Sequence, residues 1–308
     1  MPRSIRPGYS VVVSGCAGIG NIIFQTNFLE VFMSFKYSYQ VGALWGDVFE
    51  GVKRLSKIGF DAVEVAGVTS YFRDAGKIRK AVEDEKLEVS SICTMCQECD
   101  LAFPRKEERK KGIAYMNRVV DFAAALHCKR VVINPTRLTK WTPLAPLNEE
   151  LKWGAESVAE VADYAKQADI TLCVEAWNRY DTYLINTAAE CRAFVDMVKR
   201  DNVGVMLDTF HLNIEETDMA KAILDSRGYL VHIHVGDSNR AAPGMGHTDF
   251  APLLRALKEI DYQGYVTMEL VPPAADPGTY EDMHDMTAFF EEYPKTALKT
   301  LKDIEAAL

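Results

Sequence analysis

Polar side chains that can bind a cation occur where four apolar runs end in the second half of the sequence. The run "TLCVEAW" carries Glu175, "VGVMLD" ends in Asp208, and "YVTMEL" carries Glu269. The remaining run, "LVHIHVG", holds His232 and His234, which share a face because successive side chains of a strand alternate in direction. We expect His234, the imidazole nearer the end of its run, to act together with the three carboxylates.

This donor set predicts a site for one divalent cation. Three carboxylates around one point repel one another strongly unless a cation lies between them. Carboxylate oxygens with a single imidazole suit a cation of intermediate hardness better than they suit zinc, which favours thiolates in structural sites. Any one of these side chains could instead form a salt bridge or cap a helix, but the four together indicate a metal site. Mn²⁺ is the expected ion, with Co²⁺ or Mg²⁺ as alternatives.

The order of the predicted elements places these side chains at one end of a barrel. Eight β-rich runs alternate with eight amphipathic stretches from residue 35 onward, which predicts parallel strands joined by helical crossovers. At about 270 residues this pattern indicates a single (β/α)8 TIM barrel, whose catalytic groups gather at the carboxyl ends of the strands. We expect residues 33–308 to form the barrel and residues 1–32 to form an N-terminal extension of unassigned role. The predicted strands are 35–41, 62–67, 88–94, 130–135, 171–177, 203–208, 230–236 and 265–270, and the predicted helices are 46–58, 74–86, 107–127, 148–168, 187–200, 217–226, 250–260 and 281–307.

Charge, cysteine content and hydropathy limit the class of protein. The net charge of −9 argues against a nucleic-acid-binding protein, which would carry a basic face. The seven cysteines lack the spacing of a disulfide framework and suggest reduced thiols, and no apolar run is long enough to span a membrane. We therefore predict a cytoplasmic protein without membrane or nucleic-acid partners. The early stretch "VVVSGCAGIG" has too short an apolar run for a lipoprotein signal and the wrong glycine spacing for a dinucleotide-binding turn.

Four segments closely resemble one family of enzymes. "VEAWNRYDTYLINT", "LDTFHLNIEE", "HIHVGDSNRAAPGMGH" and "TMEL" are similar to segments of the xylose-isomerase-like barrels, and within them to ketose 3-epimerases of the D-tagatose and D-psicose (D-allulose) type. The resemblance is strong from about residue 170 to about residue 270 and is limited to the rhythm of strands before that. It implies that Glu175, Asp208, His234 and Glu269 bind the metal, and that Glu175 and Glu269 also form the acid–base pair.

The resemblance also implies a sugar as the substrate. His211 and Arg240 would bind its oxygens, while Asp181 stands where the family has a substrate-binding glutamate, so that its shorter side chain leaves the preferred sugar open. Epimerising a ketose at C3 removes a carbon-bound proton beside a carbonyl, gives a metal-stabilised enediolate, and returns a proton from the opposite face. A homodimer or homotetramer is expected, with a hetero-subunit as the alternative.

Several other side chains have both a functional and a structural interpretation. Trp45 and Trp177, at predicted strand ends, either stack on a sugar or pack in the core, and we expect His247 in "GMGHTDF" to line the pocket rather than bind a second ion. The cysteines of "CTMCQEC" lack the cysteine–proline tail of an iron–sulfur motif, and we interpret them as incidental thiols.

Other functions remain open at this point. Aldose–ketose isomerisation, inosose dehydration and elimination from a 3-keto glycoside all begin with the same proton abstraction, and the residues above do not separate them. Abasic-site endonucleases share this barrel, but they need extra histidines from the second and third strands, and the first histidine here is His127. A non-catalytic sugar-binding barrel is the alternative outside the enzymes, although it has no need of two opposed glutamates.

Overall fold

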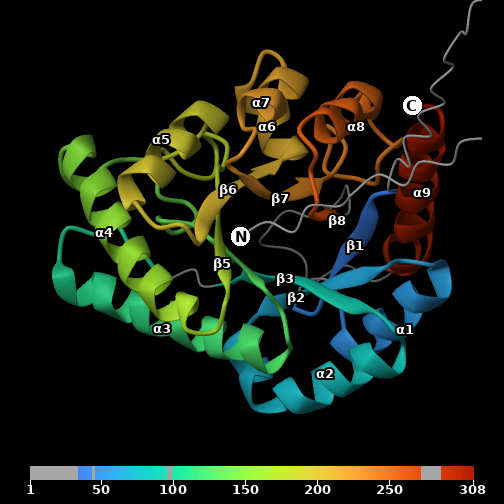
Figure 1. Ribbon diagram of the computed structural model, residues 1–308, viewed down its shortest axis with the longest axis horizontal. Helices are drawn as coiled ribbons and strands as arrows, with labels where there is room; N and C mark the ends of the chain where they lie inside the picture. The colour runs from blue at the N-terminus through green and yellow to red at the C-terminus, as the bar shows by residue number, and fades with distance from the viewer. Residues whose placement is uncertain (1–33, 44–45, 96–98, 272–285) are drawn as a thin grey trace, which may run out of the picture. The chain divides into compact units, whose positions relative to one another are not determined.

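The computed structural model describes residues 34–43, 46–95, 99–271 and 286–308, and these residues form a closed parallel barrel (Figure 1). Each strand pairs with the next along the chain, and the last pairs with the first to close the ring. The predicted (β/α)8 fold is confirmed. The strands are β1 (Lys36–Val41), β2 (Ala62–Gly67), β3 (Glu88–Thr94), β4 (Arg130–Ile133), β5 (Thr171–Glu175), β6 (Val203–Asp208), β7 (Leu230–Val235) and β8 (Tyr265–Met268).

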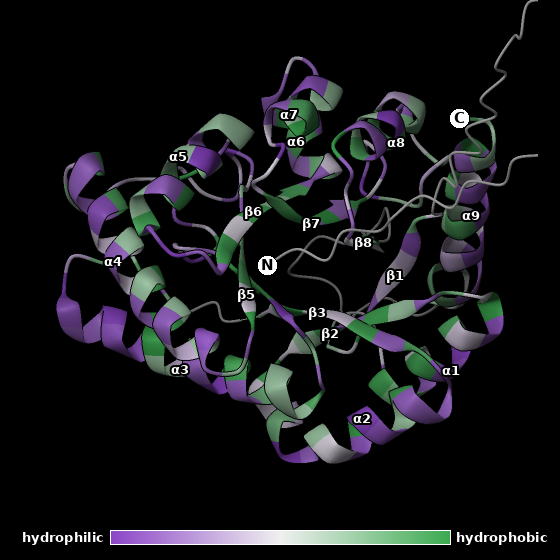
Figure 2. Ribbon diagram, in the orientation of Figure 1, coloured by the Kyte–Doolittle hydropathy of each residue, from purple (hydrophilic) through white to green (hydrophobic). Residues whose placement is uncertain are grey.

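Helices lie between the strands in sequence and surround the barrel (Figure 1). Figure 2 shows hydrophilic and hydrophobic residues mixed along each helix, as expected for helices with one face on the sheet and one in solvent. The helices are α1 (Val48–Ile58), the 3₁₀ helix η1 (Thr69–Asp74), α2 (Ala75–Asp84), α3 (Lys106–Ala125), α4 (Leu147–Lys166), α5 (Ala188–Val198), α6 (Thr209–Glu215), α7 (Met219–Asp225), α8 (Phe250–Glu259) and α9 (Thr287–Ala306).

Capping side chains explain where several helices begin and end. The carboxylate of Asp47 accepts hydrogen bonds from two backbone N–H groups in the first turn of α1, and that helix ends at Gly59, whose φ of 100° favours glycine. α5 begins with a capping box in which Thr187 and Glu190 each accept a hydrogen bond from the other's backbone N–H. Local sequence signals thus set the helices that follow β1 and β5.

The strand predictions agree with the structure to within two residues at each end, and so do the helix predictions as far as α8. The structure adds two short helices that we did not predict, η1 and α6. Some expectations fall outside the described residues: the extension over residues 1–32, Trp45, one cysteine of "CTMCQEC" and the start of the last helix at residue 281.

The described cysteines depart in one place from the expected reduced state. Cys93, Cys128, Cys173 and Cys191 are free and buried. Cys99 is disulfide-bonded, so the expectation of reduced thiols was wrong for this residue. Within the described ranges, none of the helices combines the length and the apolar character needed to cross a bilayer.

Two shifts in strand register align polar residues inside the barrel. The shift between β2 and β3 leaves Ser90 without a counterpart, and the shift between β6 and β7 leaves Val231 without one. An extra residue in one strand redirects the side chains that follow it. As a result, Asp208 at the end of β6 pairs directly with His234 on β7.

The barrel interior has an apolar part and a polar part. Val132, Cys173 and Met206, from β4, β5 and β6, form a small buried cluster. Buried polar groups are costly unless they are hydrogen-bonded, so the polar part must be internally connected. It is supplied by β1, β2, β3 and β7, whose buried polar side chains are Ser38, Gln40, Glu64, Ser90, Ser91, His232 and His234.

Candidate active site

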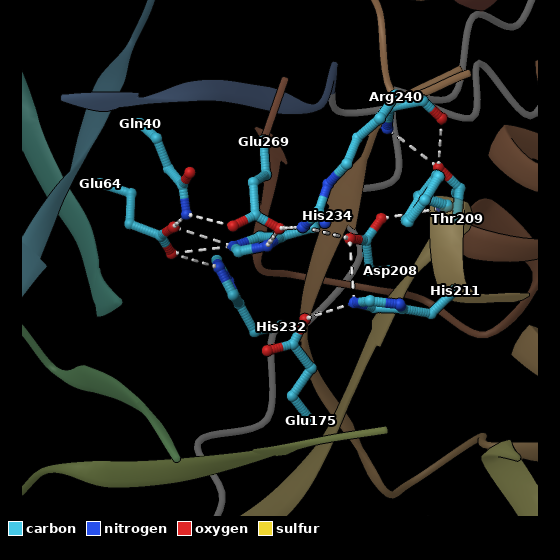
Figure 3. Close-up of polar contacts among 12 residues, drawn as sticks. Gln40, Glu64, Glu175, Asp208, Thr209, His211, His232, His234, Arg240 and Glu269 are labelled. Carbon is cyan, nitrogen blue, oxygen red and sulfur yellow. Dashed lines mark hydrogen bonds and ion pairs between the residues drawn. The ribbon is translucent and has the colours of Figure 1, made fainter. Parts of the chain in front are cut away.

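The four predicted ligands meet at the carboxyl ends of β5 to β8 (Figure 3). Glu175, Asp208, His234 and Glu269 each offer one ligand atom, and these atoms all lie within 4.8 Å of one another. All four side chains are buried. Glu175 and Glu269 enter the group from opposite sides. The barrel therefore gathers side chains from four different strand ends into one donor set.

Helix α6, which begins directly after β6, orients Asp208. The Oδ1 atom of Asp208 accepts a hydrogen bond from the backbone N–H of Phe210 (2.9 Å) and so caps the helix. The Oδ2 atom is buried and has no hydrogen-bond partner among the described residues. Burial raises the pKa of Asp208 to about 6, an effect that the charge of Arg240 opposes and the charge of Glu269 reinforces. The cap thus leaves one oxygen of this carboxylate for the site.

His211, on α6, presents a hydrogen-bond donor to the same group. Its Nδ1 accepts hydrogen bonds from the backbone N–H (3.2 Å) and the side-chain amide (2.7 Å) of Asn178, which places the ring proton on Nε2. Nε2 lies 3.7 Å from Oε1 of Glu175 and 3.8 Å from Oδ2 of Asp208. Burial holds the pKa of His211 well below its usual value, so the ring is neutral. Its Nε2–H is available to a substrate oxygen.

His234 lies between two carboxylates. Its Nε2–H donates to Oε2 of Glu64 (3.0 Å), and its Nδ1 lies 3.3 Å from Oε2 of Glu269. Burial alone would lower the pKa of His234, but the charge of Glu64 and the hydrogen bond and charge of Glu269 raise it well above its usual value. Burial alone would raise the pKa of Glu269, but Arg240 and His234 hold it well below its usual value. Glu269 is therefore ionised.

Arg240, in the loop after β7, reaches over Glu269. Its Nη2 donates to Oε2 of Glu269 (2.6 Å) and lies 3.8 Å from Oδ2 of Asp208. The guanidinium carbon lies 4.7 Å from the centre of the Phe210 ring, a cation–π contact that holds the group beside α6. Burial alone would lower the pKa of Arg240, but the charges of Glu269 and Asp208 raise it. Its buried Nε has no hydrogen-bond partner among the described residues and is therefore an available donor.

Glu175 has a different electrostatic environment from Glu269. Burial and the charge of Glu269 raise the pKa of Glu175 to about 8. Its Oε2 accepts a long hydrogen bond from the side-chain amide of Asn134 (3.4 Å). From the protein groups alone, Glu175 carries a proton near neutral pH and Glu269 does not. Two carboxyl groups whose pKa values differ in this way are suited to act as acid and base.

The arrangement fits a divalent cation. Oε1 of Glu175 and Oδ2 of Asp208 are buried acceptors without a hydrogen-bond donor among the described residues, and leaving such atoms unpaired is costly. A cation at their meeting point would pair with both and reduce the repulsion among the three carboxylates. Three carboxylates and one imidazole form a donor set for Mn²⁺, Co²⁺ or Mg²⁺. Glu175, Asp208, His234 and Glu269 are the residues that would hold it.

Two of the other predicted substrate-binding residues lie beside this group. Asp181 accepts a hydrogen bond from the side chain of Asn178 (2.9 Å) and lies 3.7 Å from Nδ1 of His211. Trp177 is half-buried, and its side chain counteracts part of the rise in the pKa of Glu175. Asp181 and Trp177 therefore lie next to the site.

The remaining predictions have different outcomes. His247 is exposed and hydrogen-bonded to Oγ of Ser238 (2.9 Å), and among the described residues it forms no hydrogen bond or ion pair with the four candidate ligands. His232 faces the barrel interior, where its Nε2 lies 3.0 Å from Oε2 of Glu64. This position supports the choice of His234 rather than His232 as one of the four candidate ligands. Trp45 lies outside the described residues.

The residues of the site that the sequence analysis missed include Gln40, Glu64 and Asn178. Glu64 had a visible signal, since it is the one charged residue in the otherwise apolar strand "AVEVAG". Gln40 and Asn178 had none, because an amide at a strand end or in a loop is common in any protein. Their importance depends on contacts with strands far along the chain.

Comparisons with known proteins agree with the fold and the resemblance. The family model described as "Xylose isomerase-like TIM barrel" matches residues 52–288. A D-psicose 3-epimerase of Agrobacterium fabrum (strain C58) is 33% identical over 226 residues, which cover 71% of this chain and 77% of that protein. A 3-dehydro-D-guloside 4-epimerase of Escherichia coli (strain K12) is 28% identical over 243 residues, covering 77% and 92%. A crystal structure of D-psicose 3-epimerase in the presence of D-fructose has a TM-score of 0.78 at 27% identity and covers 87% of this chain and 99% of that one.

Proposed function

Because this chain belongs to the xylose isomerase-like TIM barrel family, we propose that it is a divalent-metal-dependent epimerase that inverts a ketose at C3. One observation carries the proposal: Glu175 and Glu269 reach a common point from strand ends separated by β6 and β7. Inverting a carbon next to a carbonyl needs one group that removes a proton and another that returns a proton to the opposite face. Two opposed carboxyl groups of different pKa meet that need.

The opposed positions of the two glutamates set their roles. One of Glu175 and Glu269 removes the proton from C3, and the other donates its own proton to C3 from the opposite side. The reverse reaction exchanges these roles. His211 through Nε2–H and Arg240 through its guanidinium donate to the substrate oxygens. When bound, a divalent cation would supply Lewis-acid stabilisation of the negative charge on those oxygens. We expect Mn²⁺, with Co²⁺ or Mg²⁺ as alternatives.

A second candidate is epimerisation of a keto-glycoside at C4. The Escherichia coli relative is named for such a reaction, and it shares the step in which a proton is removed beside a carbonyl. Asp181 favours this alternative, because it replaces a longer side chain with a shorter one that Asn178 holds by a hydrogen bond of 2.9 Å. A shorter side chain at this position leaves more room for a substituted sugar.

A substrate screen in deuterated water tests both candidates. The protein loaded with Mn²⁺ would be incubated with free ketoses, sugar phosphates, inososes and keto-glycosides, and the products analysed by NMR spectroscopy. A ketose 3-epimerase incorporates solvent deuterium at C3 and inverts that carbon, whereas a keto-glycoside epimerase does so at C4. If the protein binds a sugar but catalyses neither deuterium exchange nor turnover, it is a sugar-binding barrel and not an enzyme.

A further inference from the structure

Glu64, on β2, lies in the polar part of the barrel interior and contacts the proposed ligand His234. Its side chain is fully buried. Nε2 of His234 lies 2.9 Å from Oε1 and 3.0 Å from Oε2 of Glu64. Nε2 of His232 lies 3.0 Å from Oε2, and the hydroxyl of Ser91 also donates to that oxygen. Figure 3 shows Glu64 on one side of His234, with Asp208 on the other.

Every neighbour of the Glu64 carboxylate is a hydrogen-bond donor. The amide of Gln40 donates to Oε1 (2.7 Å), and the other contacts come from the two imidazoles and Ser91. A carboxylate can accept all of these bonds, but only if each imidazole presents Nε2–H. With Nε2–H of His234 directed to Glu64, Nδ1 is the ring nitrogen that faces Glu269, 3.3 Å away, where the other ligand atoms lie, and it is the nitrogen that would give up its proton to bind a cation. The Glu64 contact therefore selects the form of His234 that can bind a cation through Nδ1.

Gln40 connects the same carboxylate to the second proposed ligand. Its Nε2 donates to Oε1 of Glu64 (2.7 Å) and to Oε1 of Glu269 (3.1 Å). Arg240 holds the other oxygen, Oε2, of Glu269 at 2.6 Å. The Glu269 carboxylate is thus fixed at both oxygens, one of them through a side chain that Glu64 also holds.

Glu64, His232 and His234 are themselves close enough to bind a metal ion. Two observations argue against a second cation there. The Glu64 oxygens are already occupied by donors from Gln40, Ser91 and the two imidazoles, and Nε2 of His234 cannot bind both a cation and the proton that it donates. Glu64, His232 and His234 are therefore better suited to support the cation site at the strand ends than to hold an ion of their own.

We propose that Glu64 is a positioning residue for the cation site: it fixes the Nε2–H form of His234 and, through Gln40, the orientation of Glu269. The proposal rests on the cation site of the proposed function. Carboxylate partners of ligating histidines fix the tautomer and ring orientation, and losing one typically weakens metal binding about 10- to 100-fold.

The test compares Mn²⁺ affinity in Glu64→Gln with the affinity in a matched control. Calorimetric titration of metal-free protein should show one Mn²⁺ bound per chain, and Glu64→Gln should raise the dissociation constant about 10- to 100-fold. The control is Glu150→Gln, the same substitution at another fully buried glutamate, which contacts Lys140 at 3.1 Å and none of the four ligands. That variant should lose stability but keep the parent affinity.

A second measurement does not depend on whether Glu64→Gln folds. Long-range ¹H–¹⁵N NMR spectra of the wild-type protein loaded with Mg²⁺ should show His234 protonated at Nε2 and not at Nδ1. Gln40→Leu should lower kcat about 10- to 100-fold while changing KM less, because Glu269 loses one of its two supports.

The outcomes separate this inference from the proposed function. A wild-type protein that binds no divalent ion refutes the cation site itself. One bound ion with equal affinity in the wild type and in Glu64→Gln, or a proton on Nδ1 of His234, refutes only the role of Glu64. Two ions in the wild type, with one lost in Glu64→Gln, would make Glu64 a ligand and overturn the positioning role.

Discussion

At the scale of single residues, three polar groups of the site each have one atom held by the protein and another left free. Asp208 caps α6 with Oδ1 and leaves Oδ2 unpaired. His211 accepts at Nδ1 from Asn178 and leaves Nε2–H unpaired. Glu175 is held at Oε2 by Asn134 and leaves Oε1 unpaired. The unpaired atoms face one another at 3.7 to 3.8 Å, so the site is pre-organised for a ligand that accepts and donates at one point.

The first prediction concerns the two glutamates. Glu175→Gln and Glu269→Gln should each slow epimerisation about 10²- to 10⁴-fold, because each substitution removes one acid–base group. Metal content would be measured by atomic absorption in the same samples, since loss of the ion would have the same effect. In deuterated water, one variant is expected to exchange the proton from its own face without inverting the carbon. If both variants hold metal and epimerise at the parent rate, the two-base mechanism is wrong.

The second prediction concerns Arg240. Arg240→Ala should keep one metal ion per chain and lower kcat/KM about 100-fold or more, because a donor to the substrate oxygens is lost while the four ligands remain. The matched control is Arg227→Ala, at an exposed arginine paired with Glu259, and it should behave as the parent. Loss of the metal from Arg240→Ala would instead indicate that Arg240 acts by holding Glu269 in place and not by binding the substrate.

At the scale of elements, the barrel was predictable because its signals are local. β-rich runs and amphipathic stretches alternate along the chain, and each run has the length of a strand. Helix α6 was missed because seven residues, "TFHLNIE", are too few to show a helical period. Yet α6 sets the direction of Asp208 and carries His211, so a short helix without a sequence signal completes the site.

The contacts of Glu64 with the proposed ligands could not be predicted, for a different reason. The strand "AVEVAG" indicates that Glu64 is buried, but not which side chains it meets. Its partners lie on β1, β3 and β7, and the meeting depends on the register shifts that leave Ser90 and Val231 without counterparts. A pattern with a period of two residues does not reveal where such a shift occurs.

The third prediction concerns the loop that carries Arg240. The buried Asp237 accepts hydrogen bonds from the backbone N–H groups of Ser238 (2.8 Å), Gly244 (2.9 Å) and Thr248 (2.9 Å). Burial alone would raise the pKa of Asp237, but these bonds hold it below its usual value. Asp237→Asn should therefore lower the free energy of unfolding by about 1–3 kcal/mol at neutral pH.

The pH dependence of that loss follows from the sign of the shift. A carboxyl group with a lowered pKa stabilises the fold fully above its unfolded pKa of about 3.9, and the contribution disappears as pH falls through the folded pKa. Urea unfolding should show a large difference between the parent and Asp237→Asn at neutral pH and a shrinking one in acid. The control Asp121→Asn, at an exposed residue of α3, should change stability by less than about 0.5 kcal/mol. A difference that stays constant with pH would contradict the charge-based explanation.

At the scale of the whole molecule, the proposed cation would link the ends of four of the eight strands and should stabilise the complete fold. Mn²⁺ at a hundredfold excess over its dissociation constant adds about 2.7 kcal/mol to the free energy of unfolding. For a domain of this size the fourth prediction is a rise in Tm of about 5–10 °C, reversed by a chelator and measured by calorimetry. Glu150→Gln should keep the shift, and Glu269→Gln should reduce it. A Tm that does not respond to the chelator would show that the native protein binds no stabilising cation.

The ligands and their supports come from opposite halves of the barrel. Glu175, Asp208, His234 and Glu269 belong to the half from β5 to β8, whereas Gln40, Glu64 and Ser91 belong to β1, β2 and β3. The two halves meet where β8 pairs with β1 and where β4 pairs with β5. A half-barrel from β5 to β8 would therefore carry all four proposed ligands and still lack Gln40 and Glu64. Under the proposed role of Glu64, full-affinity metal binding would report that the ring has closed, and exchanging the first half between homologous barrels would change that affinity without altering a proposed ligand.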